Sequence, residues 1–141
     1  MGFKVTIEAS ETIELGLQAV QKVIFDTDTP DDSNARSTDL GMTITVVGKI
    51  LTPVNGGVAD TSVKLAKWAL VPSESIDCYG KVTVEVLAGN KVVRQIVLDT
   101  AYVVDYREIF NDSAGVGIFE LVVRQKKDLN EKVEYKGGFS A

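Results

Sequence analysis

The stretch that decides the fold is residues 41–51, Gly-Met-Thr-Ile-Thr-Val-Val-Gly-Lys-Ile-Leu, followed by residues 60–71, Asp-Thr-Ser-Val-Lys-Leu-Ala-Lys-Trp-Ala-Leu-Val. Apolar and polar residues alternate in the first segment, which is typical of a strand with one buried face. The second segment has helical spacing, and three more alternating segments follow it, ending near Gln125. A lone helix must pack on the strands around it, so the sequence predicts a mainly β fold: a β-barrel or β-sandwich of antiparallel strands with one short flanking α-helix.

Composition limits the chain to one domain and weakens several functional classes. The chain has 141 residues, of which 45% are hydrophobic and 25% are charged, so we expect a single domain over residues 1–141. Its formal net charge is −5. Binding to nucleic acid depends on clustered lysine and arginine, so no nucleic-acid partner is expected.

The termini and the cysteine content indicate where the protein is made. No apolar run approaches the roughly 20 residues that cross a bilayer, and the start of the chain lacks the apolar core of a signal peptide. We therefore expect no membrane insertion and synthesis in the cytoplasm. Cys78 is the single cysteine, which suits a reducing compartment, and we interpret it as a small packing residue at a strand edge.

The remaining strand signals are of unequal quality. Residues 3–7 alternate cleanly, whereas residues 15–26 are apolar without regular alternation and predict a bent or bulged strand. A hairpin is predicted at residues 88–91, between strands beginning near Lys81 and Val92, and the second of these extends to about Tyr106 with a bend at residues 99–100. A charged tail at residues 126–141 is expected to be flexible.

The helix at residues 60–71 has an interpretable start, end and buried face. Asp60 or Thr61 can accept a backbone N–H bond as its cap, and Pro72 ends it. Leu65, Trp68 and Ala69 share one face, so we predict that Trp68 packs on the sheet as a core residue. Tyr102 and Phe119 are predicted to be further core anchors.

A long polar loop at residues 26–39 requires an explanation, because compact domains seldom contain such loops without a function. Its aspartates are consistent with calcium binding, but they fail the helix–loop–helix pattern, because Pro30, Asp31 and Ser37 occupy positions that need other residues. The expectation is a solvated loop without a metal. The acidic residues under consideration are Asp26, Asp28, Asp31 and Asp32.

Catalytic chemistry is poorly supported. The chain has no histidine, which excludes Ser-His-Asp and Cys-His catalysis, and one cysteine cannot form a cysteine-rich zinc site. No glycine-rich phosphate loop opens a helix. Asp105, Glu108 and Asp112 could be considered as paired carboxylates for glycoside hydrolysis, but acidic residues at a strand end are usually solvated. We expect no enzyme activity and no cofactor.

Three segments resemble the Hcp (TssD) tube proteins of type VI secretion. They are Asn-Ala-Arg-Ser-Thr-Asp-Leu-Gly-Met-Thr-Ile-Thr-Val at residues 34–46, Asp-Thr-Ser opening the helix that holds Trp68, and Leu-Asp-Thr-Ala-Tyr-Val-Val-Asp-Tyr-Arg-Glu at residues 98–108. The order of elements is also similar, and the resemblance covers roughly residues 25–127. Tail-tube proteins of contractile phages and phage-like particles share this fold and remain an alternative.

The resemblance implies a barrel subunit that closes into hexameric rings, which stack as the inner tube of a contractile apparatus. It also implies sheath, spike or baseplate proteins and effectors as partners, and assembly in the cytoplasm with ejection toward a target. On this interpretation the loop at residues 28–38 reaches a neighbouring subunit, and the turn at 52–59 and the tail contribute to ring-to-ring contacts. The candidate interface residues are Asp31, Asp32, Ser33, Asn34, Arg36, Ser37, Thr38, Asn55, Asp105 and Arg107.

Another class of function fits the same pattern of strands. A monomeric β-sandwich that binds carbohydrate or peptide would use Trp68, Tyr102 and Tyr106 as contact aromatics. That hypothesis requires these aromatic side chains to be exposed.

Overall fold

A computed structural model describes residues 1–28, 40–51, 61–112 and 116–138. Within these residues the chain forms eight strands, one α-helix and two 3-10 helices. The elements in chain order are β1 (Gly2–Glu8), β2 (Thr12–Leu15), β3 (Val20–Asp28), β4 (Gly41–Ile50), α2 (Ser62–Ala69), η1 (Ile76–Cys78), β5 (Tyr79–Ala88), β6 (Lys91–Ile109), β7 (Gly117–Gln125), η2 (Lys127–Lys132) and β8 (Glu134–Gly137).

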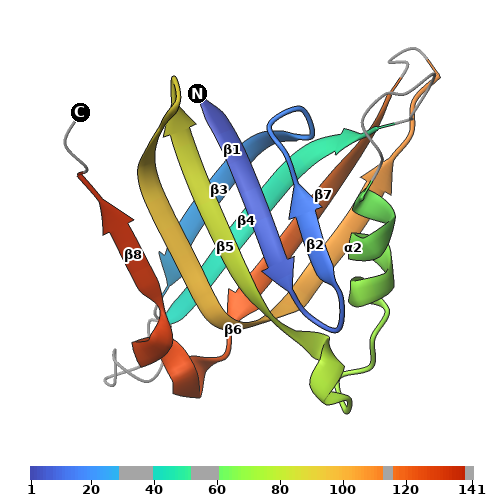
Figure 1. The fold of residues 1–141 in the computed structure, drawn as a ribbon. Helices are drawn as coiled ribbons and strands as arrows, with labels where there is room; N and C mark the ends of the chain where they lie inside the picture. Colours follow the sequence, from blue (N-terminus) through green and yellow to red (C-terminus); the bar gives the residue numbers. More distant parts are fainter. Residues whose placement is uncertain (29–39, 52–60, 113–115, 139–141) are drawn as a thin grey trace.

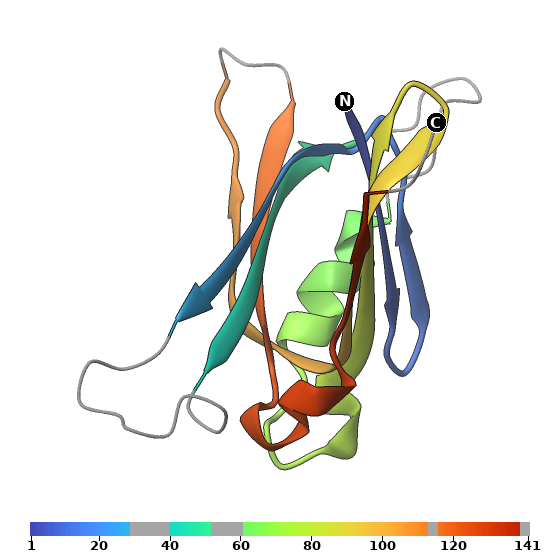
Figure 2. The ribbon, with the colours of Figure 1, turned by 90° about the vertical axis from the view of Figure 1, so that its left-hand side faces the viewer.

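The strands form one curled antiparallel sheet. Their order is β2-β1-β5-β6-β7-β4-β3, and β8 pairs with β6 outside this path. The sheet folds back on itself, so β1, β2 and β5 lie across the core from β3, β4 and β7 (Figure 1, Figure 2). Strand β6 belongs to both layers. The predicted fold class, mainly β with one flanking helix, is confirmed.

Side chains from both layers and from the helix fill a continuous core. Strand alternation supplies it, because every second residue of β4 and β7 points inward. The fully buried large side chains include Ile7, Ile13, Leu15, Ile44, Leu65, Leu98, Phe119 and Leu121. Trp68 is 4% exposed and joins the same cluster, whereas Tyr102 is only half-buried and lies outside it. The sequence prediction of a core position therefore differs from the structure at Tyr102.

The ring of Phe119 fits in the core because residue 48, on the neighbouring strand, is a glycine without a side chain. Gly48 and Phe119 are direct cross-strand partners, and a Cβ at residue 48 would lie 2.5 Å from the Cζ atom of Phe119. The β3–β4 register shifts beside this position, with the extra residue on β3 between Val20 and Lys22. Gly48 thus allows close approach of an aromatic ring.

The long strand β6 changes layers at a point that is held by a buried amide. The Oε1 atom of Gln125 accepts a hydrogen bond from the Thr100 N–H at 3.0 Å, and its Nε2 atom donates to the Leu129 carbonyl at 2.8 Å. Gln125 is fully buried. It fixes the bend predicted at residues 99–100 and also anchors the segment after β7.

Helix α2 closes one flank of the barrel, beside β2 and the second half of β6 (Figure 1). The helix is shorter than the predicted 60–71. Thr61 occupies the N-cap position but makes no side-chain cap; its hydroxyl donates instead to the Glu14 carbonyl at 2.7 Å. Asp60, the other predicted cap, lies outside the described residues. The helix is therefore tied to the sheet by this bond and by Leu65 and Trp68.

Three boundaries differ from the sequence predictions. The single strand expected over residues 15–26 is two strands, because the turn at 16–19 reverses the chain between Leu15 and Val20. The loop expected from residue 26 begins later, since β3 pairs with β4 as far as Asp28. The tail expected to be flexible instead forms η2 and β8, with Val133 packed on the core and β8 paired with β6. The hairpin predicted at residues 88–91 is confirmed, with Gly89 at φ 63°.

Candidate subunit interface

Among the described residues, one layer of the barrel has a strand edge without a pairing partner on each side. We call β3, β4, β7 and residues 103–109 of β6 the open layer. β3 is the last strand of the sheet order, and residues 103–109 of β6 pair with β7 alone among the described residues. Each edge carries backbone N–H and C=O groups directed away from the layer. Such edges form hydrogen bonds with a further strand if one approaches.

The outward face of the β3 edge mixes apolar and charged side chains. Lys22, Ile24 and Asp26 lie opposite outward residues of β4 and are exposed, whereas Val23 and Phe25 pair with buried residues and are partly buried. The exposed side of β3 is therefore neither wholly polar nor wholly apolar. Composition alone does not decide whether this edge is an interface, because non-obligate interfaces are about as apolar as the rest of a protein surface.

The opposite edge contains both of the described residues that the sequence analysis proposed for an interface. Asp105 and Arg107 are exposed on the outward face of β6. A register shift between Val103 and Asp105 leaves Val104 as an extra residue, which is 44% exposed. The bulge was not evident in the sequence, because Val103-Val104 reads equally well as continuous strand.

Arg107 already has an ion-pair partner within the subunit. Its Nε and Nη2 atoms donate to Oε2 of Glu120, the cross-strand residue on β7, at 3.0 and 2.8 Å. This hydrogen bond and the charge of Glu120 raise the pKa of Arg107 above its ordinary value, with a smaller contribution from Asp105. The pair holds the Arg107 guanidinium on the outward face of the open layer. The carboxylate of Asp105 lies nearby on the same face.

The other proposed interface residues cannot be placed. Asp31, Asp32, Ser33, Asn34, Arg36, Ser37, Thr38 and Asn55 lie outside the described residues. The flanking residues Asp28 and Leu40 end β3 and precede β4, and Asn130 donates to the Leu40 carbonyl at 2.7 Å. Their role in an interface stays a prediction.

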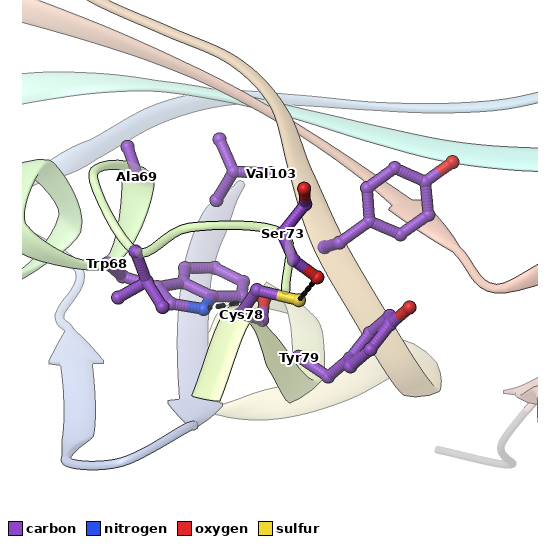
Figure 3. Close-up of a pocket in the computed structure, with 8 residues that line it drawn as sticks. Trp68, Ala69, Ser73, Cys78, Tyr79 and Val103 are labelled. Carbon is purple, nitrogen blue, oxygen red and sulfur yellow. Dashed lines mark hydrogen bonds between the residues drawn. The ribbon is translucent and has the colours of Figure 1, made fainter. Parts of the chain in front are cut away.

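A pocket of about 230 Å³ lies between the C-terminal end of α2, η1 and the start of the second half of β6. Figure 3 shows Trp68 and Cys78 in its wall: Trp68 Nε1 donates to the Cys78 carbonyl at 3.0 Å, and Cys78 Sγ lies 3.8 Å from the Ser73 carbonyl. Tyr79 and Tyr102 meet edge to face, with centroids 6.3 Å apart. The sequence analysis missed this pocket, because its walls come from segments up to 35 residues apart that share no motif.

The aromatic side chains are not arranged as a carbohydrate platform. Trp68 is nearly fully buried and Tyr102 and Tyr106 are half-buried. Stacking on a sugar needs exposed aromatic faces, so the structure does not favour the binding-module hypothesis.

The described residues contain neither a metal-binding cluster nor a helix that could span a membrane. Within residues 1–28, 40–51, 61–112 and 116–138, no group of three acidic or cysteine residues is close enough to hold a metal ion. In the same part of the chain, the helices are too short and too polar to cross a bilayer.

Comparison with known proteins connects this geometry to one architecture. The sequence matches no protein-family model and no curated protein. In structure, the chain is similar to Hcp1 from Flavobacterium johnsoniae, with a TM-score of 0.58, 18% identity, and 100% of both chains covered. The chain has the Hcp-like tube-protein fold.

Chains of a prophage baseplate and of an extracellular contractile injection system share this Hcp-like fold. A chain of the six-fold symmetrised baseplate of the anti-feeding prophage matches with a TM-score of 0.56 and 13% identity, over 96% of this chain and 93% of the other. A chain of the PVC sheath–tube complex matches with a TM-score of 0.54 and 12% identity, over 96% and 88%. The fold prediction drawn from the sequence resemblance is therefore confirmed.

Proposed function

We propose that this protein is a structural, non-enzymatic subunit that joins copies of itself edge to edge into a closed ring, and that rings stack as the inner tube of a contractile injection apparatus. The observation that carries the proposal is the open layer, which in the part of the chain that the structure describes has an unpaired edge on each side. One edge of one copy can meet the other edge of the next. Such a contact between unlike surfaces closes into a ring if the rotation between copies is a whole fraction of a turn.

Strand directions in the open layer suit this arrangement. β3 pairs antiparallel with β4, β4 with β7, and β7 with β6, so β3 and β6 run in opposite directions. Rotation about a ring axis keeps each strand's direction along that axis. β3 of one copy therefore meets β6 of the next as an antiparallel pair, and the sheet continues without a break.

One register of that pair joins two apolar residues and one pair of opposite charges, and it also places Asp28 opposite Asp105, which is unfavourable. If Ile24 lies opposite Ile109 of the next copy, Asp26 lies opposite Arg107, and all four side chains are on the outward face. Ile24 and Ile109 are both exposed in the subunit. Arg107 would then lie between Glu120 of its own chain and Asp26 of its neighbour.

The tube proposal extends to symmetry, partners and location. Six copies agree with the six-fold symmetry of the anti-feeding prophage baseplate, whose chain shares the fold. A sheath, a spike or baseplate and effectors are the proposed partners, and assembly occurs in the cytoplasm before ejection. A type VI secretion tube is the first assignment, because Hcp1 covers the whole chain, and a phage-like tail tube is the alternative.

Size-exclusion chromatography with light scattering, followed by negative-stain microscopy, tests the proposal. The expected species is an annulus with a mass near six subunits of 15.2 kDa, whose fraction rises with protein concentration. A strict monomer at high concentration and low salt, with no annular particles, contradicts the proposal and returns the binding module as the better hypothesis.

A further inference from the structure

The turn between β6 and β7 carries an exposed aromatic knob. Phe110 is 70% exposed, and Ile109 and Val116 beside it are also exposed. The ring lies over Gly117, where a Cβ would be 2.8 Å from its Cε1 atom, so the glycine gives the ring a seat on the hairpin. An apolar group this exposed at a hairpin end is unfavourable in water unless another surface covers it.

The pocket beside α2 is a socket of suitable size and chemistry. Its volume of about 230 Å³ exceeds the roughly 150 Å³ of a cavity known to admit benzene. Aliphatic groups of Ala69, Val71 and Val103 and the rings of Tyr79 and Tyr102 line it. An entering phenyl ring would meet aromatic edges and methyl groups, with Cys78 in the wall (Figure 3).

Knob and socket lie at opposite ends of the same strand segment. Tyr102 and Val103 line the socket, and Phe110 follows eight residues after Tyr102, so the two features are about 27 Å apart along β6. Figure 1 shows this half of β6 rising from the bend at the bottom of the sheet toward the upper right of the view. A copy displaced along the strand brings its socket to the knob of the copy behind it.

We propose that Phe110 of one subunit inserts into the socket of a second copy of this chain in the adjacent ring. The inference rests on the proposed tube function and assigns its ring-to-ring contact. Because the contact joins two unlike surfaces by displacement along one direction, it repeats without closing, as a growing tube requires.

One cation beside the socket can pair with the carboxylates beside the knob. Glu108 and Asp112 flank the knob and are exposed. Lys126 lies at the socket, with its Nζ atom 5.7 Å from the ring centroid of Tyr79. Its present partner is Asp128 at 3.4 Å, an exposed pair of little strength that can exchange for a carboxylate of the knob. Glu74 and Asp77 lie between the wall residues Ser73 and Cys78, so this side of the socket is acidic and the pairing rests on Lys126 alone.

The natural cysteine in the socket provides the test. Phe110→Cys puts a second thiol on the knob, and each chain then carries one cysteine at each end of the proposed contact. Under mild oxidation of concentrated protein, we expect a non-reducing gel to show a ladder of bands at successive multiples of the subunit mass. The matched control is Leu17→Cys, since Leu17 is also exposed but precedes β3 rather than lying on the β6–β7 turn.

Two additional variants separate the contact from random oxidation. Phe110→Cys combined with Cys78→Ser must lose the ladder, leaving at most dimers. Ser73→Trp, at an exposed position of the socket wall, is expected to shorten stacks at least tenfold in micrographs while rings persist.

The outcomes distinguish this inference from the proposed function. Rings by light scattering together with the ladder support both. Intact rings whose Phe110→Cys variant gives no more cross-linking than Leu17→Cys overturn the knob-and-socket contact and leave the ring proposal standing; this is also the result if a sheath protein or small molecule fills the pocket. Absence of rings in the wild-type protein overturns the proposed function itself.

Discussion

The two halves of strand β6 share one backbone but have different surroundings. In the first half, residues 94–97 have β5 on one side and β8 on the other, and Ile96, Val97 and Leu98 are buried. In the second half, residues 103–109 have only β7 beside them among the described residues, and Val104 and Ile109 are exposed. The first half is complete within one subunit.

This difference between the two halves of β6 is the basis for proposing that the second half pairs with another copy of the chain. The short strand β8 covers one β6 edge, and Tyr135 within it packs 5.7 Å from Phe25 and lies below Arg94. Among the described residues the second half has no such strand; helix α2 lies beside part of it, but a helix does not pair with the backbone of the edge. An edge left open beside an exposed bulge is consistent with pairing between copies.

The largest expected effect comes from the core that both halves share. Phe119→Ala should lower the free energy of unfolding by about 3–5 kcal/mol, because it leaves a cavity over Gly48. Chemical denaturation measures it. Val122→Ala, on the outward face of the same strand, is the matched control and should cost less than half as much. Equal losses of stability in the two variants would mean that the inward face of β7 contributes no more to the core than its outward face.

The next largest effect should be on ring formation through the second half of β6, without a change in the fold of the subunit. Asp26→Arg places two cations together in the proposed register and should weaken every contact between copies around the ring. The melting temperature of the isolated subunit should not change. Light scattering would show rings lost in this variant and in Arg107→Asp.

The double variant Asp26→Arg, Arg107→Asp sharpens that result. It restores opposite charges across the contact and should recover rings, although Glu120 then faces a new carboxylate and recovery will be partial. Rings that survive both single changes would show that these edges do not meet in this register.

A smaller effect is expected at the boundary between the two halves. Gln125→Leu leaves the Thr100 N–H and the Leu129 carbonyl without their partner and should destabilise the subunit by about 1–3 kcal/mol. Gln18→Leu, at an exposed position, is the control. If the two variants unfold alike, the amide does not hold the bend.

The smallest effect concerns the helix that flanks the second half. Thr61→Val removes the hydroxyl bond to the Glu14 carbonyl and should cost about 0.5–1.5 kcal/mol in thermal or chemical unfolding. Thr61→Ser keeps the hydroxyl and should stay close to wild type. A loss in both variants would point to packing of the threonine methyl group instead.

Local patterns were sufficient to predict the clean strands and the buried face of the helix. Alternation at Met42, Ile44 and Val46 specifies one buried face, and Gly89 supplies the positive φ that the hairpin needs. At a spacing of three residues, Leu65 and Trp68 lie on the same face of a helix, which predicts that both are buried. These features depend on neighbours within a few residues.

The remaining features depend on residues far away in the chain. Thr61 reads as a cap, yet its hydroxyl bonds to Glu14, 47 residues earlier, and Gln125 reads as the polar end of a strand, yet it is fully buried. Tyr102 alternates like a core residue but lines the pocket. The free edges themselves follow from strand order, which local patterns do not specify.

Hydrogen exchange of the wild-type protein at low and high concentration tests the central claim most directly. The account predicts that amides of β3 and of residues 103–109 become protected as rings form, while those of residues 94–97, already between β5 and β8, do not change. Protection that is the same at both concentrations for β3 and residues 103–109, in a sample that light scattering shows to be assembled, would contradict it.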